Sequence, residues 1–337
     1  MTIIKSQKLF FLFSLAGLLV LFLLNVAVGS SPISIASSLA VLVQPGAEPA
    51  TSIVWILRLP KAVTCLLVGG GLAVSGLMMQ SIFRNPLAGP DVLGLSSGAS
   101  LAVAVVILAG RMLPIPLTLP WLHAAAATIG CLVIFLIMAA VASRMRSSVS
   151  LLIVGLMTAA TTTSITAILQ YVSHADDLQA YIIWTMGSVG GTRWPEIAVL
   201  AFFIGAGCLI ALTQLKPLNA WVLGEGYAQS IGINVTRSRM MIMFATSLIT
   251  GSITAFCGPI SFVGLAVPHL VRIGAPTMRH QQLIPLVIIT GATLVLTCDL
   301  LAQLPGASQV LPLNAVTALL GAPVVIWVLM RSKRIEF

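Results

Sequence analysis

Charged residues are scarce in this chain: Asp, Glu, Lys and Arg together make up 7% of its 337 residues, while apolar residues make up 58%. A soluble domain carries about 25% charged residues, because polar groups have to cover its surface. A chain this poor in charge could not cover a globular surface in water, whereas a lipid bilayer removes that requirement. The composition therefore predicts one membrane domain over residues 1–337 and excludes an ordinary soluble protein.

Several patterns that carry chemistry are also missing. The sequence has no GxxxxGK[ST] phosphate-binding loop, so energy from ATP would have to come from another chain. The five cysteines lie apart in apolar runs without CxxC spacing, which predicts neither a disulfide framework nor a metal site. No nucleophile or acid pair is placed for catalysis, so we expect no enzymatic activity and no cofactor. The net charge of +9 comes from cations scattered between apolar runs, which favours membrane topology over nucleic-acid binding.

The few charged residues divide the apolar stretches into spans. A helix needs about 20 apolar residues to cross the hydrocarbon core, and an Arg, Lys or Asp at its centre costs about 2.5–3.5 kcal/mol. An all-α polytopic fold with about ten transmembrane helices is predicted. The spans lie within 8–29, 61–84, 91–111, 111–144, 146–176, 196–216, 239–257, 260–271, 279–299 and 312–330. The first apolar run is too long for a typical signal peptide and is expected to stay as a span, with cleavage after the small residues at 29–31 as the alternative.

The distribution of cations orients these spans. Alternating ten spans places both termini on one side together with most of the 17 Lys and Arg residues. Only four cations fall on the other side: Arg58, Lys61, Arg111 and Arg193. Cytoplasmic loops are enriched in Lys and Arg. We therefore expect both termini in the cytoplasm and the protein in the cytoplasmic (inner) membrane.

The predicted cytoplasmic loop 215–239 contains a short amphipathic helix. Glu225 suits the first turn of a helix and Gly232 suits its end. The residues of interest are Leu223, Gly224, Glu225, Tyr227, Ala228, Ile231 and Gly232. Such a helix could dock into a groove on a partner protein or lie on the bilayer surface, and the pattern leaves both open.

Two local patterns predict how particular spans end and pack. Pro86 and Pro90 prevent a continuous helix after the second span, and Asp91 is positioned to cap the third. The second span also has a side of small residues, which predicts close packing against another helix, with a substrate-facing role as the alternative. These residues are Gly69, Gly70, Gly71, Ala73, Ser75 and Gly76.

Ionisable residues are almost absent from the middle of the spans. A proton- or sodium-coupled transporter usually carries such residues there. Asp299, His123 and His269 lie near span ends, where a structural hydrogen bond is the favoured role. An ion-coupled secondary transporter is therefore the alternative class of function, and a protein driven by a partner is preferred.

Short motifs distributed along the chain resemble those of the FecCD-type permeases of ATP-binding-cassette (ABC) importers for ferric siderophores, haem and cobalamin. The matching residues are Arg58-Leu59-Pro60-Lys61, Gly76, Gln80, Arg84-Asn85-Pro86-Leu87-Ala88, Leu93-Gly94, Trp184-Thr185-Met186-Gly187-Ser188, Glu225-Gly226-Tyr227-Ala228, Ile231-Gly232, Gly258-Pro259 through Leu265, Pro268-His269-Leu270-Val271-Arg272, Asp299 and Gly321-Ala322-Pro323. They follow the family order over nearly the whole chain.

The resemblance implies a set of partners. It implies a permease homodimer, two cytoplasmic ATPase subunits and an extracytoplasmic binding protein that delivers an iron chelate such as a ferric siderophore, with haem or cobalamin as alternatives. The segment from Leu223 to Gly232 would seat on the ATPase as a coupling helix. Arg58 and Lys61 match basic positions that pair with acidic residues of the binding protein. Gln303 stands where the family often has arginine, which puts that contact in doubt.

The resemblance also suggests which spans line the translocation path. The fifth, eighth and tenth spans would do so, and Thr158, Thr161 and Thr162 of the fifth are candidates for its wall. The alternative is that these hydroxyls only bond to their own helix.

Overall fold

The structure is a computed structural model, and it describes residues 2–29, 33–43, 46, 50–110, 121–145, 148–275, 277, 279–303 and 310–331. Over these residues the chain is helical apart from short connections and contains no strand. The predicted all-α fold is thus confirmed. Arg111 and Arg146, which bound predicted spans, lie outside the described residues.

Seven helical stretches among the described residues are long and apolar enough to cross a membrane, and three apolar helices are shorter. The long ones contain α1 (Thr2–Ala27), α4 (Leu59–Phe83), α6 (Leu122–Arg144), α7 (Ser148–Val172), α9 (Trp194–Thr213), α12 (Val235–Cys257) and α14 (His280–Ala302). The shorter ones are α5 (Leu95–Leu108), α13 (Val263–Gly274) and the stretch Leu313–Trp327 of α15 (Leu313–Arg331). Each of these helices coincides with one predicted span, in the same order along the chain.

Helices outside the predicted spans were not expected from the sequence. They are α2 (Ile35–Val43), α8 (Ala175–Thr185) and α10 (Leu215–Val222). The second span is also longer than predicted, because α3 (Ala50–Ser52) and the π-helix η1 (Ile53–Arg58) run directly into α4. Hydropathy over about 20 residues detects segments that fill a bilayer, so it overlooks short helices and turns at the ends of spans.

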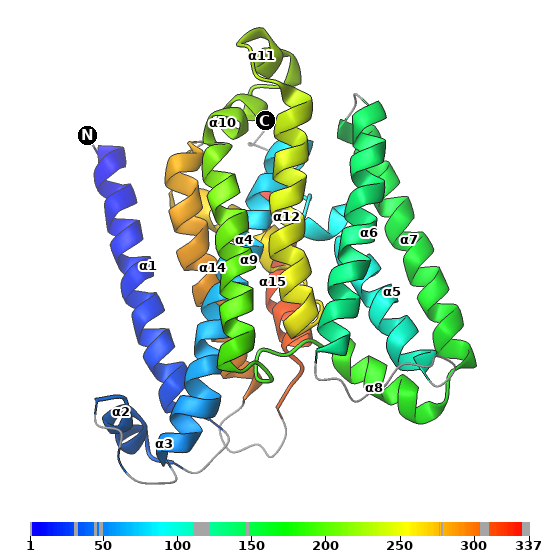
Figure 1. The fold of residues 1–337 in the computed structure, drawn as a ribbon. Coiled ribbons are helices and arrows are strands. Elements are labelled where there is room, and N and C mark those ends of the chain that lie inside the picture. The colour runs from blue at the N-terminus through cyan, green and yellow to red at the C-terminus, as the bar shows by residue number, and fades with distance from the viewer. Residues whose placement is uncertain are drawn as a thin grey trace. The chain divides into compact units, whose positions relative to one another are not determined.

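The helices group into two compact units. Unit 1 comprises residues 1–74, 188–202 and 260–336, and unit 2 comprises residues 75–187 and 203–259 with the last residue. In unit 1, α1 packs on α14, and α13, α14 and α15 pack on one another (Figure 1). In unit 2, α5 packs against α6, α7 and α8, while α12 lies against α6. Helices α4 and α9 begin in unit 1 and continue into unit 2.

The backbones of α4 and α14 touch within unit 1. A Cβ atom built on Gly69 would lie 2.2 Å from the carbonyl oxygen of Gly291, and one built on Gly291 would lie 2.3 Å from the carbonyl oxygen of Gly69. Small residues allow membrane helices to approach this closely, which gains van der Waals contact where lipid offers no hydrophobic driving force. The close packing predicted from the glycines of the second span is confirmed.

Replacing Gly291 by alanine should therefore destabilise the protein by about 1–3 kcal/mol, the usual range for overpacking a tight interface. The added methyl group would meet backbone rather than a movable side chain. Thermal unfolding in detergent would measure the loss. Gly17→Ala is the matched control, because nothing lies within 4 Å of its Cβ position. Equal melting temperatures for both variants would contradict the observed contact.

The turn after α4 explains how that span ends. The helix stops at Phe83, and Arg84 takes a positive φ of 46°. The side-chain oxygen of Asn85 then accepts a 2.9 Å hydrogen bond from the backbone N–H of Leu87. The predicted interruption is confirmed.

The predicted cap at Asp91 is wrong. Asp91 lies inside the short 3₁₀ helix η2 (Pro90–Leu93), where its carboxylate accepts a hydrogen bond from the hydroxyl of Ser96. The residue at the start of α5 is instead Gly94, which has φ of 74° and provides no side-chain cap. The 3₁₀ turn thus delays the start of α5 beyond the residue that the sequence suggested.

Candidate functional site

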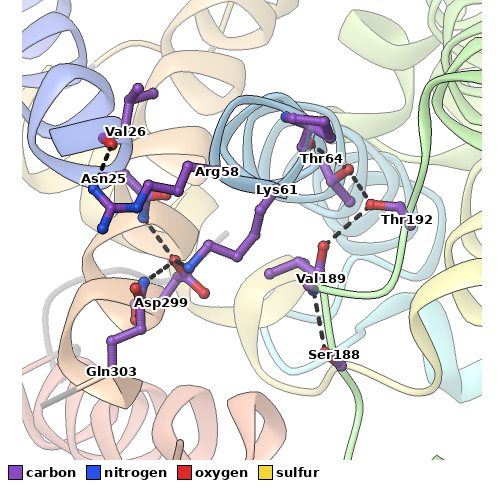
Figure 2. A network of polar contacts seen from close by, with 12 residues as sticks. Asn25, Val26, Arg58, Lys61, Thr64, Ser188, Val189, Thr192, Asp299 and Gln303 are labelled. Atoms are coloured by element: carbon purple, nitrogen blue, oxygen red, sulfur yellow. Dashed lines mark hydrogen bonds and ion pairs between the residues drawn. The ribbon is translucent and has the colours of Figure 1, made fainter. Parts of the chain in front are cut away.

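A buried carboxylate joins three helices at one end of unit 1. Asp299, near the end of α14, is 5% exposed. Its Oδ2 atom accepts hydrogen bonds from Asn25 Nδ2 at 2.7 Å and Gln303 Nε2 at 2.6 Å, and it pairs with Lys61 Nζ at 3.0 Å (Figure 2). A buried charge is tolerated when it is paired and hydrogen-bonded. Asp299 therefore fastens α1 and α4 to α14, in keeping with the structural role predicted for it.

Arg58 lies at the same end of unit 1 and is also buried. Its Nη1 atom donates to the carbonyl oxygens of Ala27 at 2.7 Å and Val26 at 3.3 Å, and to Ser38 Oγ at 3.0 Å. The last carbonyls of a helix have no partner within the helix and carry partial negative charge. Arg58 therefore caps the end of α1.

A second set of hydrogen bonds continues this polar region along α4. The hydroxyls of Thr64 and Thr192 lie 2.6 Å apart, and Thr192 donates to the carbonyl oxygen of Val189 at 3.1 Å (Figure 2). The segment before α9 is thereby held against the first turns of α4. Arg58 and Lys61, which the family resemblance marks for docking a binding protein, both have partners within unit 1: Arg58 on the last carbonyls of α1 and Lys61 on Asp299.

A short helix in unit 2 forms the predicted partner-binding segment. Helix α11 spans Glu225–Ser230, and Gly232 follows it with φ of 83°. Leu223, Tyr227 and Ile231 are 64%, 47% and 53% exposed, whereas Ala228 is fully buried. Leu223 is the C-cap of α10, Tyr227 lies within α11 and Ile231 follows its last residue. The segment therefore presents three side chains to its surroundings, while Ala228 is buried.

Arg239, in the first turns of α12, contacts this segment through its side chain. It is 2% exposed, and its Nη2 atom lies 2.9 Å from Glu225 Oε1. The guanidinium also donates at 3.3 Å to the carbonyl oxygen of Met145 and at 3.3 Å to Ser148 Oγ. Its Cζ atom lies 5.4 Å from the centre of the Trp221 ring. The end of α6 and the starts of α7 and α12 therefore meet the α10–α11 segment around one side chain.

The threonines of α7 bond to their own helix. Thr158, Thr161 and Thr162 donate to the carbonyl oxygens of the residues four positions earlier, at 2.8, 2.9 and 3.1 Å. The intrahelical alternative is what the structure contains. Thr161 is exposed, Thr158 is half-buried and Thr162 is buried, so a role in the wall of a path remains a prediction and fits Thr161 best.

The remaining motif residues either end a helix or are packed inside one. Gly258 ends α12 with φ of 72°, and a Cβ there would lie 2.7 Å from the carbonyl oxygen of Trp184. Pro259 follows it. Pro268 and His269 lie buried inside α13, and Arg272 is half-buried in its last turn. Within the described residues, no group of three or more His, Cys, Asp or Glu side chains could hold a metal ion.

Sequence reasoning missed several residues of these sites, among them Asn25, Arg239 and Trp221. Asn25 is a polar residue at the end of an apolar run, and that signal could have marked it. Arg239 was used only as the boundary of a span, and Trp221 was not considered. Their partners lie on other helices, so the pairing could not be derived from local pattern.

Comparisons with known proteins agree with this architecture. A family profile described as the FecCD transport family matches residues 17–331. The hemin transport system permease protein HmuU of Yersinia pestis is 35% identical over 322 residues, which cover 94% of this chain and 95% of HmuU. The vitamin B12 import system permease protein BtuC of Salmonella typhi is 37% identical over 286 residues, covering 83% and 84%.

A solved structure is similar over almost the full length. It is described as an inward-facing conformation of a metal-chelate type ABC transporter. It matches with a TM-score of 0.81 and 25% identity, and the match covers 97% of this chain and 99% of that one. Together, the family match and the two relatives place this sequence in a single group of permeases, and the chain belongs to the FecCD transport family.

Proposed function

We propose that this chain is the permease subunit of an ATP-driven importer that carries an iron chelate across the cytoplasmic membrane. Two copies would form the pathway, two separate ATPase subunits would drive it from the cytoplasm, and a binding protein would deliver the cargo from outside. The permease itself performs no covalent chemistry. FecCD membership supports the transport role, and the similarity to permease subunits supports placing the ATPase in other chains.

The observation that carries the proposal is the α10–α11 segment. Leu223 at the end of α10, Tyr227 within α11 and Ile231 just after α11 are exposed side chains on a segment outside the membrane-spanning helices. A helix that inserts its apolar face into a groove is a recurring mode of protein recognition. Glu225 and Gly224 fix where this helix begins, and Gly232 allows the chain to turn after it. We infer that this face seats on the ATPase.

The orientation of the chain fits that role. Arg84, Glu225 and Met145 gather at one end of unit 2, where a Cβ on Gly224 would lie 3.6 Å from Arg84 Nη1 and Arg239 reaches both Glu225 and Met145. All of these connections were assigned to the cytoplasm by charge. We therefore propose a cytoplasmic location for α11 and for both termini.

The cargo is proposed to be a ferric siderophore, with haem and cobalamin as the alternatives. The relatives are described as hemin and vitamin B12 permeases and the similar structure as a metal-chelate transporter, which supports a large chelate of this kind. A thermal-shift screen of the binding protein with ferric siderophores, haem and cobalamin would identify the cargo.

The transport role is tested by reconstitution. The chain would be purified together with a candidate ATPase and a candidate binding protein and placed in proteoliposomes. Uptake of the chelate should require ATP and the binding protein. Uptake that follows an ion gradient and continues without ATP would instead establish a secondary transporter.

Docking of the binding protein is proposed to involve Lys61 and Arg58. Because Lys61 already pairs with Asp299, an acidic side chain of the partner would have to share or replace that carboxylate. Lys61→Gln should weaken binding of the binding protein at low salt, where charge pairs contribute most. Arg193→Gln is the control, since Arg193 is exposed in the segment before α9. Unchanged affinity in Lys61→Gln would remove this residue from the interface.

A further inference from the structure

We propose that Arg239 is the positioning residue that joins the coupling segment to the membrane-spanning helices of unit 2. The inference rests on the proposed function, because it assumes that a partner pushes on α11. It concerns how that movement reaches the transmembrane helices. The observation behind it is that four chain segments contact one guanidinium group.

The contacts of Arg239 form a junction. On one side it pairs with Glu225 of α11 at 2.9 Å and lies 5.4 Å from the ring of Trp221 in α10. On the other side it donates to Met145, which follows α6, and to Ser148, which opens α7. Since Arg239 itself belongs to α12, the side chain joins the two short helices of the loop to the ends of three long ones.

The chemistry of arginine suits such a junction. Its planar guanidinium carries five N–H donors in a fixed arrangement and also stacks on aromatic rings. The carbonyl oxygen of Met145 lies just beyond the last turn of α6, where the helix dipole favours a cation. Lysine would retain the charge but could not hold the same set of partners at once.

Helix α11 depends on this contact for a stiff attachment. It has six residues, and helices much shorter than about 12 residues are marginal without tertiary contacts. Its Ala228 is buried, and the carbonyl oxygen of Ala228 accepts from Ile233 within the same loop. Without the Arg239–Glu225 pair, α11 would remain on the chain but could move without displacing α6, α7 or α12.

The expected result of losing Arg239 is uncoupling. In proteoliposomes with the ATPase and binding protein, Arg239→Gln should lower the chelate transported per ATP hydrolysed by about tenfold, within the usual range of coupling between sites. Arg239→Lys should give an intermediate ratio. The matched control is Arg237→Gln, because Arg237 is an exposed arginine on the same turn of α12.

This ratio separates positioning from mere stabilisation. A purely structural role would reduce the amount of assembled complex while leaving transport per ATP unchanged in the molecules that assemble. Wild-type ratios in both Arg239→Lys and Arg239→Gln would overturn the proposal.

A second measurement does not depend on the partners. A spin label would be attached at Gln229→Cys on the exposed side of α11, in a Cys208→Ser background, because Cys208 is partly exposed and the other four cysteines are buried. The label should become more mobile in Arg239→Gln and in Arg239→Lys but stay unchanged in Arg237→Gln. Unchanged mobility in both Arg239 variants would refute the anchoring. Wild-type protein without ATP-dependent uptake would refute the proposed function alone, because the mobility result would still report on the junction.

Discussion

Replacing Asp299 by leucine should destabilise the protein by about 3–5 kcal/mol, the range for removing one partner of a buried ion pair. The substitution leaves Lys61 with an uncompensated charge and removes the carboxylate that accepts from the amides of Asn25 and Gln303, although Gln303 keeps the backbone carbonyl oxygen of residue 299 as an acceptor. The three helices that meet at this carboxylate would then lose their shared polar contact. Thermal or denaturant unfolding of the purified protein in detergent would measure the change.

A double variant separates the charge from the shape of the site. Asp299→Leu combined with Lys61→Met should recover much of the lost stability, because apolar residues can replace a buried pair without a net loss. Asp176→Leu is the matched control: Asp176 is exposed at the start of α8, and surface changes usually stay within about 0.5 kcal/mol. A double variant as unstable as the single one would show that the charge of Lys61 is not what destabilises Asp299→Leu.

Replacing Gly232 by proline should abolish coupled transport while the protein still reaches the membrane. Gly232 has φ of 83°, whereas proline fixes φ near about −65°. Its N–H also donates to the carbonyl oxygen of Gln229 at 3.0 Å, and proline lacks that donor. The end of α11 and the exposed Ile231 beside it would be displaced. ATP-driven uptake in proteoliposomes, normalised to the amount of inserted protein, would measure the effect.

Two alanine substitutions calibrate this result. Gly232→Ala keeps the N–H and adds only the strain of a left-handed backbone conformation, about 1–2 kcal/mol. This variant should therefore transport at a reduced rate. Gly226→Ala lies within α11 and meets no atom within 4 Å, so it should transport like the wild type. Full activity in Gly232→Pro would rule out α11 as the coupling element.

Much of the fold could be predicted because the bilayer imposes a simple rule. A charge at mid-span is costly, so the scarce charged residues mark where helices leave the membrane, and each predicted span corresponds to one helix, including α13 for the span within 260–271. The short helices α2, α8 and α10 were not predicted, since each has at most 11 residues and is too short to fill a bilayer. The second span was predicted to begin at Lys61 because charged residues were taken as span boundaries, although the apolar helical stretch already begins at Ala50.

The contacts of the candidate sites lie beyond such reasoning. Asn25 and Asp299 are separated by 274 positions, and no local pattern connects them. Arg58 and Lys61 were selected by family resemblance as surface cations, but the structure places Arg58 on the last carbonyls of α1 and Lys61 on a buried carboxylate. Glu225 and Gly232 were recognised, because helix starts and ends have sequence signals, whereas their anchor Arg239 has none.

The contact of Gly69 with Gly291 limits how the protein can rearrange during its working cycle. Where two main chains touch without intervening side chains, neither helix can slide or rotate without a steric clash, since interiors are packed too densely to deform continuously. The first half of α4 and the middle of α14 should thus travel as one rigid body. Spectroscopic distance measurements between labels on these two stretches should give a constant separation in every nucleotide state of the partner ATPase.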